Sequence, residues 1–171
     1  MGQLKYLMIH CASTPPGREV DKEDIIRWHT DPPPQGRGWS VPGYARLIKL
    51  DGEIQTLVEQ DGDKWIEAGE ITNGAAGFNG VAEHICFAGG ANRRGDPVFD
   101  DFDLVLTPEQ FVALEQEVME WLGNHQDLQV MGHNQVNSHK YCPGYDVRQF
   151  LRFLGIPEKN IFQGPVLFKN A

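Results

Sequence analysis

The stretch over residues 132–146, GHNQVNSHKYCPGYD, gathers side chains that could do chemistry. His133, His139 and Cys142 offer nitrogen and sulfur atoms that bind metal ions, and Lys140 adds a positive charge. Catalytic zinc takes three protein ligands and leaves the fourth tetrahedral position to water. For a catalytic metal site at this stretch, we expect the third ligand to come from elsewhere in the chain.

His10, in the run YLMIHCAS, is the candidate for that distant ligand. The apolar run predicts a strand that ends there, because the following STPPG contains prolines and a glycine. Side chains alternate between the faces of a strand, so His10 and Cys11 point to opposite sides. We expect His10 to face a cleft and Cys11 to enter the packed layer beneath it. The sequence lacks the HExxH zinc signature, so the fold itself must bring the ligands together.

Each of these residues also has an ordinary structural explanation. A lone histidine at a strand end is more often hydrogen-bonded than metal-bound, and a lone cysteine is more often part of the core. We interpret His29 mainly as a packing residue, and His84 as a core histidine on a strand. Residue types and spacing alone leave both explanations open.

The elements that must position these residues alternate between strand and helix patterns. Apolar and alternating runs predict strands at residues 5–11, 44–49 and 54–58, in EHICFAGG and in LQVMG. Capping signals predict helices that begin after Thr107 and Asp146, and an acidic first turn at Asp21, Glu23 and Asp24 predicts a helix in DKEDIIRWHT. Asp51-Gly52 favours a tight hairpin. We therefore expect an α/β fold, a single domain with a central mixed β-sheet of about five strands flanked by about three helices.

Length and composition narrow the class of protein. With 171 residues the chain can bury a continuous core without oligomerisation, so we expect a monomer, with one domain over residues 1–155 and a tail over 156–171. The net charge of -9 repels phosphate backbones, so nucleic-acid binding is not expected. Three cysteines without a CxxC pair predict reduced thiols. The N-terminal apolar run is too short for a signal peptide or membrane insertion, so we expect synthesis in the cytoplasm.

Six segments together resemble a known family. They read IHCAST, WH, VPGYARLIKLDGEI, AAGFNGVAEHICFAGG, LTPEQ and GHNQVNSHKYCPGYDV. In this order, over roughly residues 5–154, the chain resembles the zinc-dependent N-acetylmuramoyl-L-alanine amidases of the phage-lysozyme type, which are related to peptidoglycan recognition proteins. The resemblance implies that residues 1–155 form a catalytic domain. It also implies hydrolysis of the amide between N-acetylmuramic acid and L-alanine in peptidoglycan.

The resemblance assigns roles to five residues of this sequence. The zinc (Zn2+) ligands fall on His10, His133 and Cys142, and the catalytic roles fall on Tyr44 and Lys140. Lys140 would stabilise the oxyanion that develops on the scissile carbonyl. Tyr44 would donate a hydrogen bond to the same oxygen or orient the attacking water, and the sequence leaves this choice open.

The interval from His133 to Cys142 is one residue longer than in the phage-type pattern. The extra residue makes His139 a competing ligand. We prefer His133, because it follows the predicted strand directly, as the family's ligand does.

Two other places depart from the family pattern. Asn73 and Gly74 stand where the family often has an alanine-histidine pair, which would alter a substrate contact. Ala45 and Arg46 follow Tyr44 where a histidine and an aromatic residue are more usual, so the wall of the cleft is expected to differ. Neither departure removes an expected metal ligand.

Other functions stay open at this point. One is a non-catalytic peptidoglycan-binding module of the same fold, although such modules usually lack the cysteine ligand. Another is a cysteine-histidine hydrolase, with Cys142 as nucleophile and His133 or His10 as base. A third, inhibition of another protein, has no sequence feature that tests it. For the amidase the expected partner is peptidoglycan or muropeptides, and the expected place of action is the bacterial cell wall, as for a phage or prophage endolysin.

Overall fold

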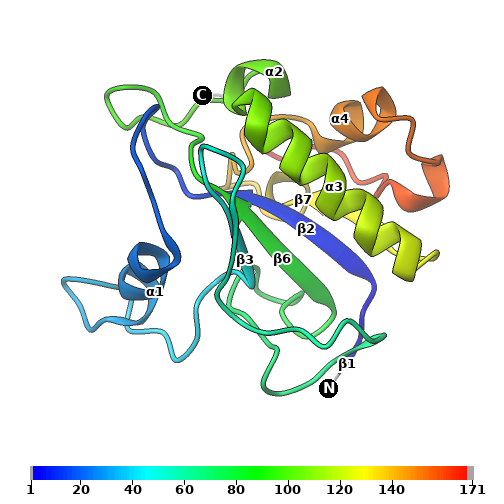
Figure 1. Cartoon of the computed structure of the whole chain (residues 1–171), viewed down its shortest axis with the longest axis horizontal. Helices are drawn as coiled ribbons and strands as arrows, with labels where there is room; N and C mark the ends of the chain where they lie inside the picture. The colour runs from blue at the N-terminus through cyan, green and yellow to red at the C-terminus, as the bar shows by residue number, and fades with distance from the viewer. Residues whose placement is uncertain (1, 169–171) are drawn as a thin grey trace.

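The computed structural model describes residues 2–168 and is built around a β-sheet of five strands in the order β4-β3-β6-β2-β7 (Figure 1). The strands are β2 (Tyr6–Cys11), β3 (Arg46–Ile48), β4 (Ile54–Thr56), β6 (Ala82–Phe87) and β7 (Gln129–Gly132). Neighbouring strands are parallel except β4, which runs antiparallel to β3. A separate two-stranded sheet pairs β1 (Gly2–Gln3) with β5 (Trp65–Ile66). The mixed five-stranded sheet confirms the predicted fold class.

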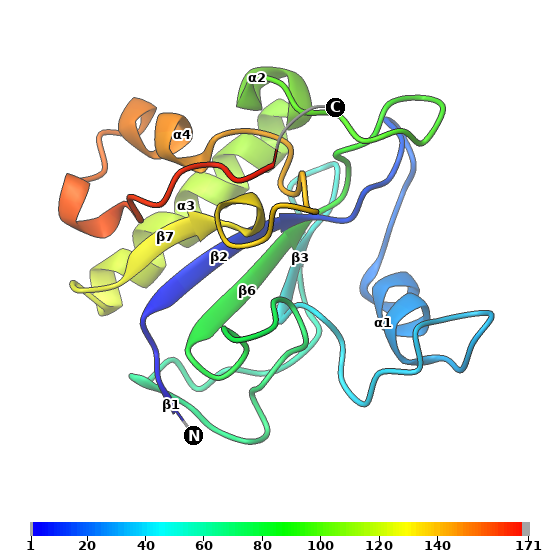
Figure 2. The same cartoon turned by 180° about the vertical axis from the view of Figure 1, so that it is seen from behind.

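Helices lie on both sides of this sheet. They are α1 (Lys22–Thr30), α2 (Phe102–Val105), α3 (Pro108–Asn124) and α4 (Val147–Phe153), with 3-10 turns η1 (His133–Gln135) and η2 (Glu158–Asn160). α3 crosses in front of the sheet in Figure 1 and behind it in Figure 2. On the other face, Ile25 of α1 packs with Leu47 and Cys86. Within residues 2–168, no helix combines the length and the apolar character needed to cross a bilayer.

Alternation along β2 separates the two faces of the sheet. Leu7, Ile9 and Cys11 belong to the apolar core that includes Leu114 of α3 and Phe150 of α4. Met8 and His10 therefore point to the opposite face, away from α3. The prediction that Cys11 enters the packed layer is confirmed, since its side chain is buried in that core.

Local signals set the ends of α3 and of the β3–β4 hairpin as predicted. The Thr107 side chain accepts a hydrogen bond from the Gln110 backbone N–H at 3.0 Å, and the Gln110 side chain accepts one from the Thr107 N–H at 3.1 Å. This capping box satisfies N–H groups that the first helical turn leaves unpaired. In the hairpin, Gly52 has a φ of 84°, and the Lys49 N–H donates to the Glu53 carbonyl at 2.8 Å.

Two strands are shorter than predicted. β3 begins at Arg46, so Tyr44 lies just before the strand, because β3 pairs with β6 only from Arg46 to Ile48. β4 ends at Thr56, because the backbone N–H groups of the next two residues donate hydrogen bonds to the Ala45 carbonyl, at 2.7 and 3.2 Å. α2, β1 and β5 are too short to leave a periodic pattern, and the sequence did not indicate them.

The described part of the expected tail packs against β7. Ile161 forms a bridge with Val130, and the Phe162 N–H donates to the Val130 carbonyl at 3.0 Å. The Asn160 side chain donates to two carbonyls that precede β7, both at 2.8 Å. Residues 169–171 of the tail lie outside the described residues. The division of the chain at residue 155 stays a prediction.

Candidate active site

Two strand ends and one loop bring His10, His133 and Cys142 together. His10 lies near the carboxyl end of β2, His133 opens η1 directly after β7, and Cys142 lies in the loop before α4. Because β2 and β7 are parallel neighbours, their carboxyl ends meet at the same edge of the sheet. One nitrogen or sulfur atom from each residue lies within 4.8 Å of the others, and all three side chains are buried.

The spacing of the His10 and Cys142 donor atoms suits ligands of a tetrahedral metal ion. Cys142 Sγ lies 3.5 Å from His10 Nδ1. With zinc–sulfur and zinc–nitrogen bonds of about 2.3 and 2.0–2.1 Å, a tetrahedral ion separates such ligands by about 3.6 Å. Two imidazoles and one thiolate leave one vertex for water or substrate, which is the donor set of a catalytic zinc site.

His139 does not join this group. Its side chain is exposed, and its backbone N–H donates to Asn137 Oδ1 at 3.0 Å. His133 stays beside His10 because it follows β7 without an intervening loop, and the two rings lie 4.8 Å apart between centroids. The geometry thus favours His133 over His139 as the partner of His10 and Cys142.

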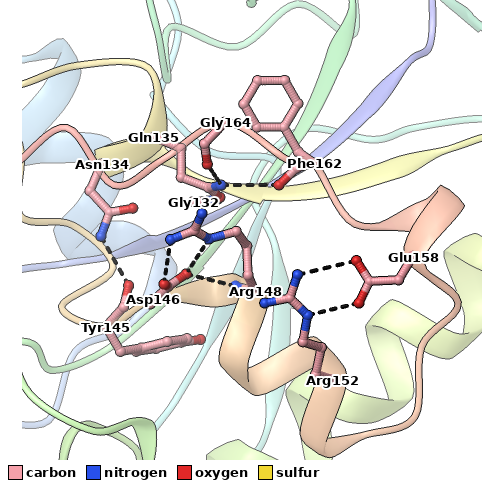
Figure 3. A network of polar contacts seen from close by, with 10 residues as sticks. All are labelled: Gly132, Asn134, Gln135, Tyr145, Asp146, Arg148, Arg152, Glu158, Phe162 and Gly164. Atoms are coloured by element: carbon pink, nitrogen blue, oxygen red, sulfur yellow. Dashed lines mark hydrogen bonds and ion pairs between the residues drawn. The ribbon is translucent and has the colours of Figure 1, made fainter.

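Asn134 ties η1 to the loop that carries Cys142. Its backbone N–H donates to the Cys142 carbonyl at 2.8 Å. Its side-chain amide donates to the Tyr141 and Tyr145 carbonyls at 3.2 and 2.9 Å, and the second of these bonds is drawn in Figure 3. Asn134 is fully buried, so these bonds are shielded from competing water. These bonds therefore hold His133 and Cys142 in fixed positions relative to one another.

Gln135 ties the same turn to the C-terminal segment (Figure 3). Its side-chain amide donates to the Phe162 and Gly164 carbonyls at 3.2 and 2.6 Å, and its oxygen accepts from the Gly132 N–H at 2.8 Å. The segment after residue 155 thus supports the turn that carries His133.

Burial keeps the site histidines uncharged. It lowers the pKa of His10 well below the usual value, with further contributions from His133 and His84. Burial, followed by the charge of Lys140, lowers the pKa of His133 to about 4. Both imidazoles are therefore neutral at pH 7, so their nitrogen lone pairs are available to a metal.

The Cys142 thiol is protonated in the metal-free protein. Burial, and then the neighbouring Cys11 thiol, raise the pKa of Cys142 well above its usual value. The Cys11 backbone N–H donates to Cys142 Sγ at 3.2 Å, which supports a negative charge on the sulfur once the proton leaves. A metal bound here would have to displace that proton, so its affinity must rise with pH.

A cleft of about 550 Å³ opens onto this group, and both Tyr44 and Lys140 line it. The Tyr44 ring lies 5.0 Å from the His10 ring between centroids. Burial raises the pKa of Tyr44 well above its usual value, so the phenol keeps its proton at neutral pH. The structure therefore brings all five residues singled out from the sequence to one place.

The rest of the cleft is aromatic and basic. Trp28, Trp39, Tyr141 and Phe168 line it, and the Arg37 guanidinium lies 5.1 Å from the centre of the Trp39 ring. Among the described lining residues there is no aspartate or glutamate. The cleft is thus a basic concavity on a chain with a net charge of -9.

The two departures from the family pattern lie in different surroundings. Asn73 and Gly74 line the cleft, where the sequence predicted an altered substrate contact. Arg46 turns away to the α3 side, where its guanidinium binds the Glu117 carboxylate at 2.7 Å. Ala45 is fully buried, and neither residue lines the cleft, so the predicted difference in the cleft wall at Ala45 and Arg46 was wrong.

Two residues that the sequence indicated mainly as packing or core residues contact the site. His84 Nδ1 lies 2.9 Å from His10 Nε2. His29 packs on Trp39 as expected, but it also lines the cleft, and its Nδ1 accepts the Gly43 N–H at 3.0 Å, next to Tyr44. Alternation places His84 on one face of β6, but only the register with β2 shows that it reaches His10.

Two phage endolysins are similar to this chain in sequence. The endolysin of Enterobacteria phage K11 is 26% identical over 150 residues, which cover 88% of this chain and 87% of the phage protein. The endolysin of Klebsiella phage KP32 is 25% identical over 148 residues, which cover 86% of this chain and 85% of that protein.

Solved structures share the fold at lower identity. The N-acetylmuramoyl-L-alanine amidase LysC from Clostridium intestinale superposes with a TM-score of 0.65 at 18% identity, over 91% of this chain and 88% of LysC. Bumblebee PGRP-SA superposes with a TM-score of 0.66 at 18% identity, over 96% of this chain and 87% of that one. The sequence model of the family described as N-acetylmuramoyl-L-alanine amidase matches residues 1–145, and the chain belongs to this amidase family.

Proposed function

We propose that the protein is a zinc-dependent peptidoglycan amidase that uses His10, His133 and Cys142 as metal ligands. The bond cleaved is the amide between the lactyl group of N-acetylmuramic acid and L-alanine of the stem peptide. The observation that carries this proposal is the convergence of two imidazoles and one thiol within 4.8 Å, at the floor of a cleft in a chain of the amidase family. When bound, zinc would supply Lewis-acid activation of the scissile carbonyl and of the attacking water.

Lys140 and Tyr44 supply the chain's own contribution to the chemistry. Lys140 places a positive charge on the cleft wall, where it stabilises the negative charge that develops on the carbonyl oxygen. Tyr44 holds its proton at neutral pH and serves as a hydrogen-bond donor to that oxygen or to the attacking water. Its high pKa makes it a poor general base.

The lining of the cleft suits a glycopeptide that carries carboxylates. Arg37 and Lys140 supply positive charge, and Trp39 offers an aromatic face to a sugar ring or a peptide plane. Similarity to two phage endolysins supports action on the bacterial cell wall. Peptidoglycan or its muropeptides are the substrate under this proposal.

The cysteine-hydrolase alternative fits the site less well. A nucleophilic cysteine needs a lowered pKa and access to substrate. Cys142 is buried and its pKa is raised, with its sulfur directed at His10 Nδ1 and the Cys11 N–H. These contacts suit a metal ligand, because a bound cation would replace the thiol proton.

Digestion of defined muropeptides, followed by mass spectrometry, tests the proposal. The zinc-loaded protein is expected to release free stem peptide from lactyl-muramic acid, and a chelator or Cys142→Ser is expected to abolish the release. Restoring zinc to the chelated protein should restore the activity. Activity that survives chelation but not thiol alkylation would support the cysteine hydrolase instead. Full zinc occupancy without cleavage would point to the binding module.

A further inference from the structure

We infer that His84 is a positioning residue that fixes the orientation and the tautomer of His10 at the metal site. The inference rests on the proposed metal site and concerns a residue outside its ligand set. Its basis is the contact of 2.9 Å between His10 Nε2 and His84 Nδ1, together with full burial of both rings.

The two nitrogens of His10 face different partners. Nδ1 lies 3.5 Å from Cys142 Sγ, so it is the nitrogen on the metal side. Nε2 lies on the opposite edge of the ring and faces His84. A ring that gives its Nδ1 lone pair to a metal carries its proton on Nε2 and donates that proton to His84 Nδ1. Such a hydrogen bond on the far nitrogen orients a ligand and strengthens its bond to the metal.

The position of the His84 ring depends on the glycine at position 74. Gly74 lies against its ring, since a Cβ at Gly74 would be 2.4 Å from His84 Nδ1 and 2.7 Å from the Gly43 carbonyl oxygen. A side chain at position 74 would thus displace the ring or the neighbouring backbone. Gly74 belongs to the pair of residues that departs from the family pattern.

The other nitrogen of His84 offers no stabilising contact. With Nδ1 as acceptor, the ring proton sits on Nε2, which is buried and has no hydrogen-bond partner within residues 2–168. An unpartnered buried donor costs free energy. A purely structural role does not account for a polar ring here, whereas an acceptor for His10 does.

Two substitutions at position 84 separate these roles. His84→Leu keeps much of the ring volume but removes the acceptor. His84→Asn is smaller, but its side-chain oxygen can take the place of Nδ1. Zinc affinity, measured by competition with a fluorescent chelator, is expected to fall about 10- to 100-fold in His84→Leu and to recover most of that loss in His84→Asn. The free energy of unfolding of the metal-free variants, measured in parallel, should not follow the order of their zinc affinities. His84→Asn leaves a larger cavity than His84→Leu and so should not be the more stable variant.

Gly74→Ala provides a second test that keeps His84. It is expected to weaken zinc binding by displacing the ring, whereas Gly80→Ala, with no atom within 4 Å of the added Cβ, is the matched control and should bind like the wild-type protein. The visible spectrum of the cobalt-substituted proteins should change with Gly74→Ala and not with Gly80→Ala.

The outcomes distinguish this inference from the proposed function. Absence of zinc binding to the wild-type protein would overturn both. Tight zinc binding to the wild-type protein and equally tight binding to His84→Leu would overturn the inference alone. Equal losses in His84→Leu and His84→Asn would also overturn it, because the acceptor would then be irrelevant. Should His84→Leu not fold, the comparison of Gly74→Ala with Gly80→Ala decides, and equal affinities there would overturn the inference.

Discussion

The same strands present different kinds of side chain on the two faces of the central sheet. Under α3 and α4, β2 contributes Leu7 and Ile9 to an apolar core. On the opposite face, the alternate residues of β2 and β6 include His10 and His84, which are buried as neutral imidazoles. Burying polar rings costs free energy unless they are fully hydrogen-bonded. The comparison teaches that the α3 face contributes mainly apolar core, whereas the opposite face combines a smaller apolar cluster with donor atoms that are buried at a stability cost.

The first test of this difference removes a proposed metal ligand from the face opposite α3. His133→Ala is expected to abolish zinc binding and amidase activity, because a single imidazole and a thiol remain. His139→Ala is the matched control for metal binding, since His139 lines the cleft but is exposed and outside the group, and it should keep its zinc. Metal analysis and muropeptide digestion measure the two effects. The opposite result, with loss in His139→Ala only, would reassign the ligand.

The second change removes charge from the cleft wall and leaves the ligands in place. Lys140→Met is expected to lower kcat about 100- to 1000-fold, the usual cost of losing a group that stabilises an oxyanion. Zinc affinity should not fall, because Lys140 is not a ligand and its charge repels a cation, and the free energy of unfolding should stay unchanged. Lys5→Met, an exposed lysine just before β2, is the control and should keep full activity. A normal kcat in Lys140→Met would remove this residue from the chemistry.

The third change is made on the α3 face. Leu114 is fully buried in the core, so Leu114→Ala is expected to lower the free energy of unfolding by about 2–5 kcal/mol. Val112→Ala, on the exposed side of the same helix, should change it by less than about 0.5 kcal/mol. Denaturant titration measures both values. Zinc affinity of folded Leu114→Ala should match the wild-type protein, and a large loss of affinity would show that the two faces are not independent.

The fourth change concerns Glu83, a buried carboxylate opposite Leu7 on the α3 face. Burial raises its pKa from 4.5 to about 8. Between these values the folded protein holds a proton that the unfolded chain has released, so stability falls as pH rises from about 4.5 to 8. Glu83→Gln removes this dependence. The variant is expected to be more stable than the wild-type protein by a few kcal/mol at pH 8, since one pKa unit corresponds to about 1.4 kcal/mol.

Denaturant titrations of both proteins from pH 4 to pH 9 would measure that difference. The two stability curves should lie closest at the acid end and separate as pH rises. Parallel curves would show that Glu83 is ionised in the folded protein.

Local patterns in the sequence predicted much of the fold, and the family resemblance assigned the ligand set, whose three side chains lie together in the structure. Strand alternation separated His10 from Cys11, and the capping box placed the start of α3. The strand end directly before His133 favoured it over His139. The contact of His84 with His10 was not predictable, because it depends on the register between β2 and β6, which local pattern does not fix.

Local sequence pattern also did not predict the short elements or the contacts of the C-terminal segment. β1 and β5 have two residues each, so no periodicity marks them. The segment after residue 155 looked like an appended tail, yet its carbonyls accept the Gln135 amide beside the site. Such contacts link residues far apart in the chain, and composition alone gives no sign of them.

X-ray absorption at the zinc edge of the purified, zinc-loaded protein tests the central claim most directly. The account predicts one sulfur ligand at about 2.3 Å and light-atom ligands at about 2.0–2.1 Å, two of them with the outer-shell scattering of imidazole. The sulfur should be absent in Cys142→Ser. A first shell without sulfur in the wild-type protein, or one with more than one sulfur, would contradict the proposed metal centre.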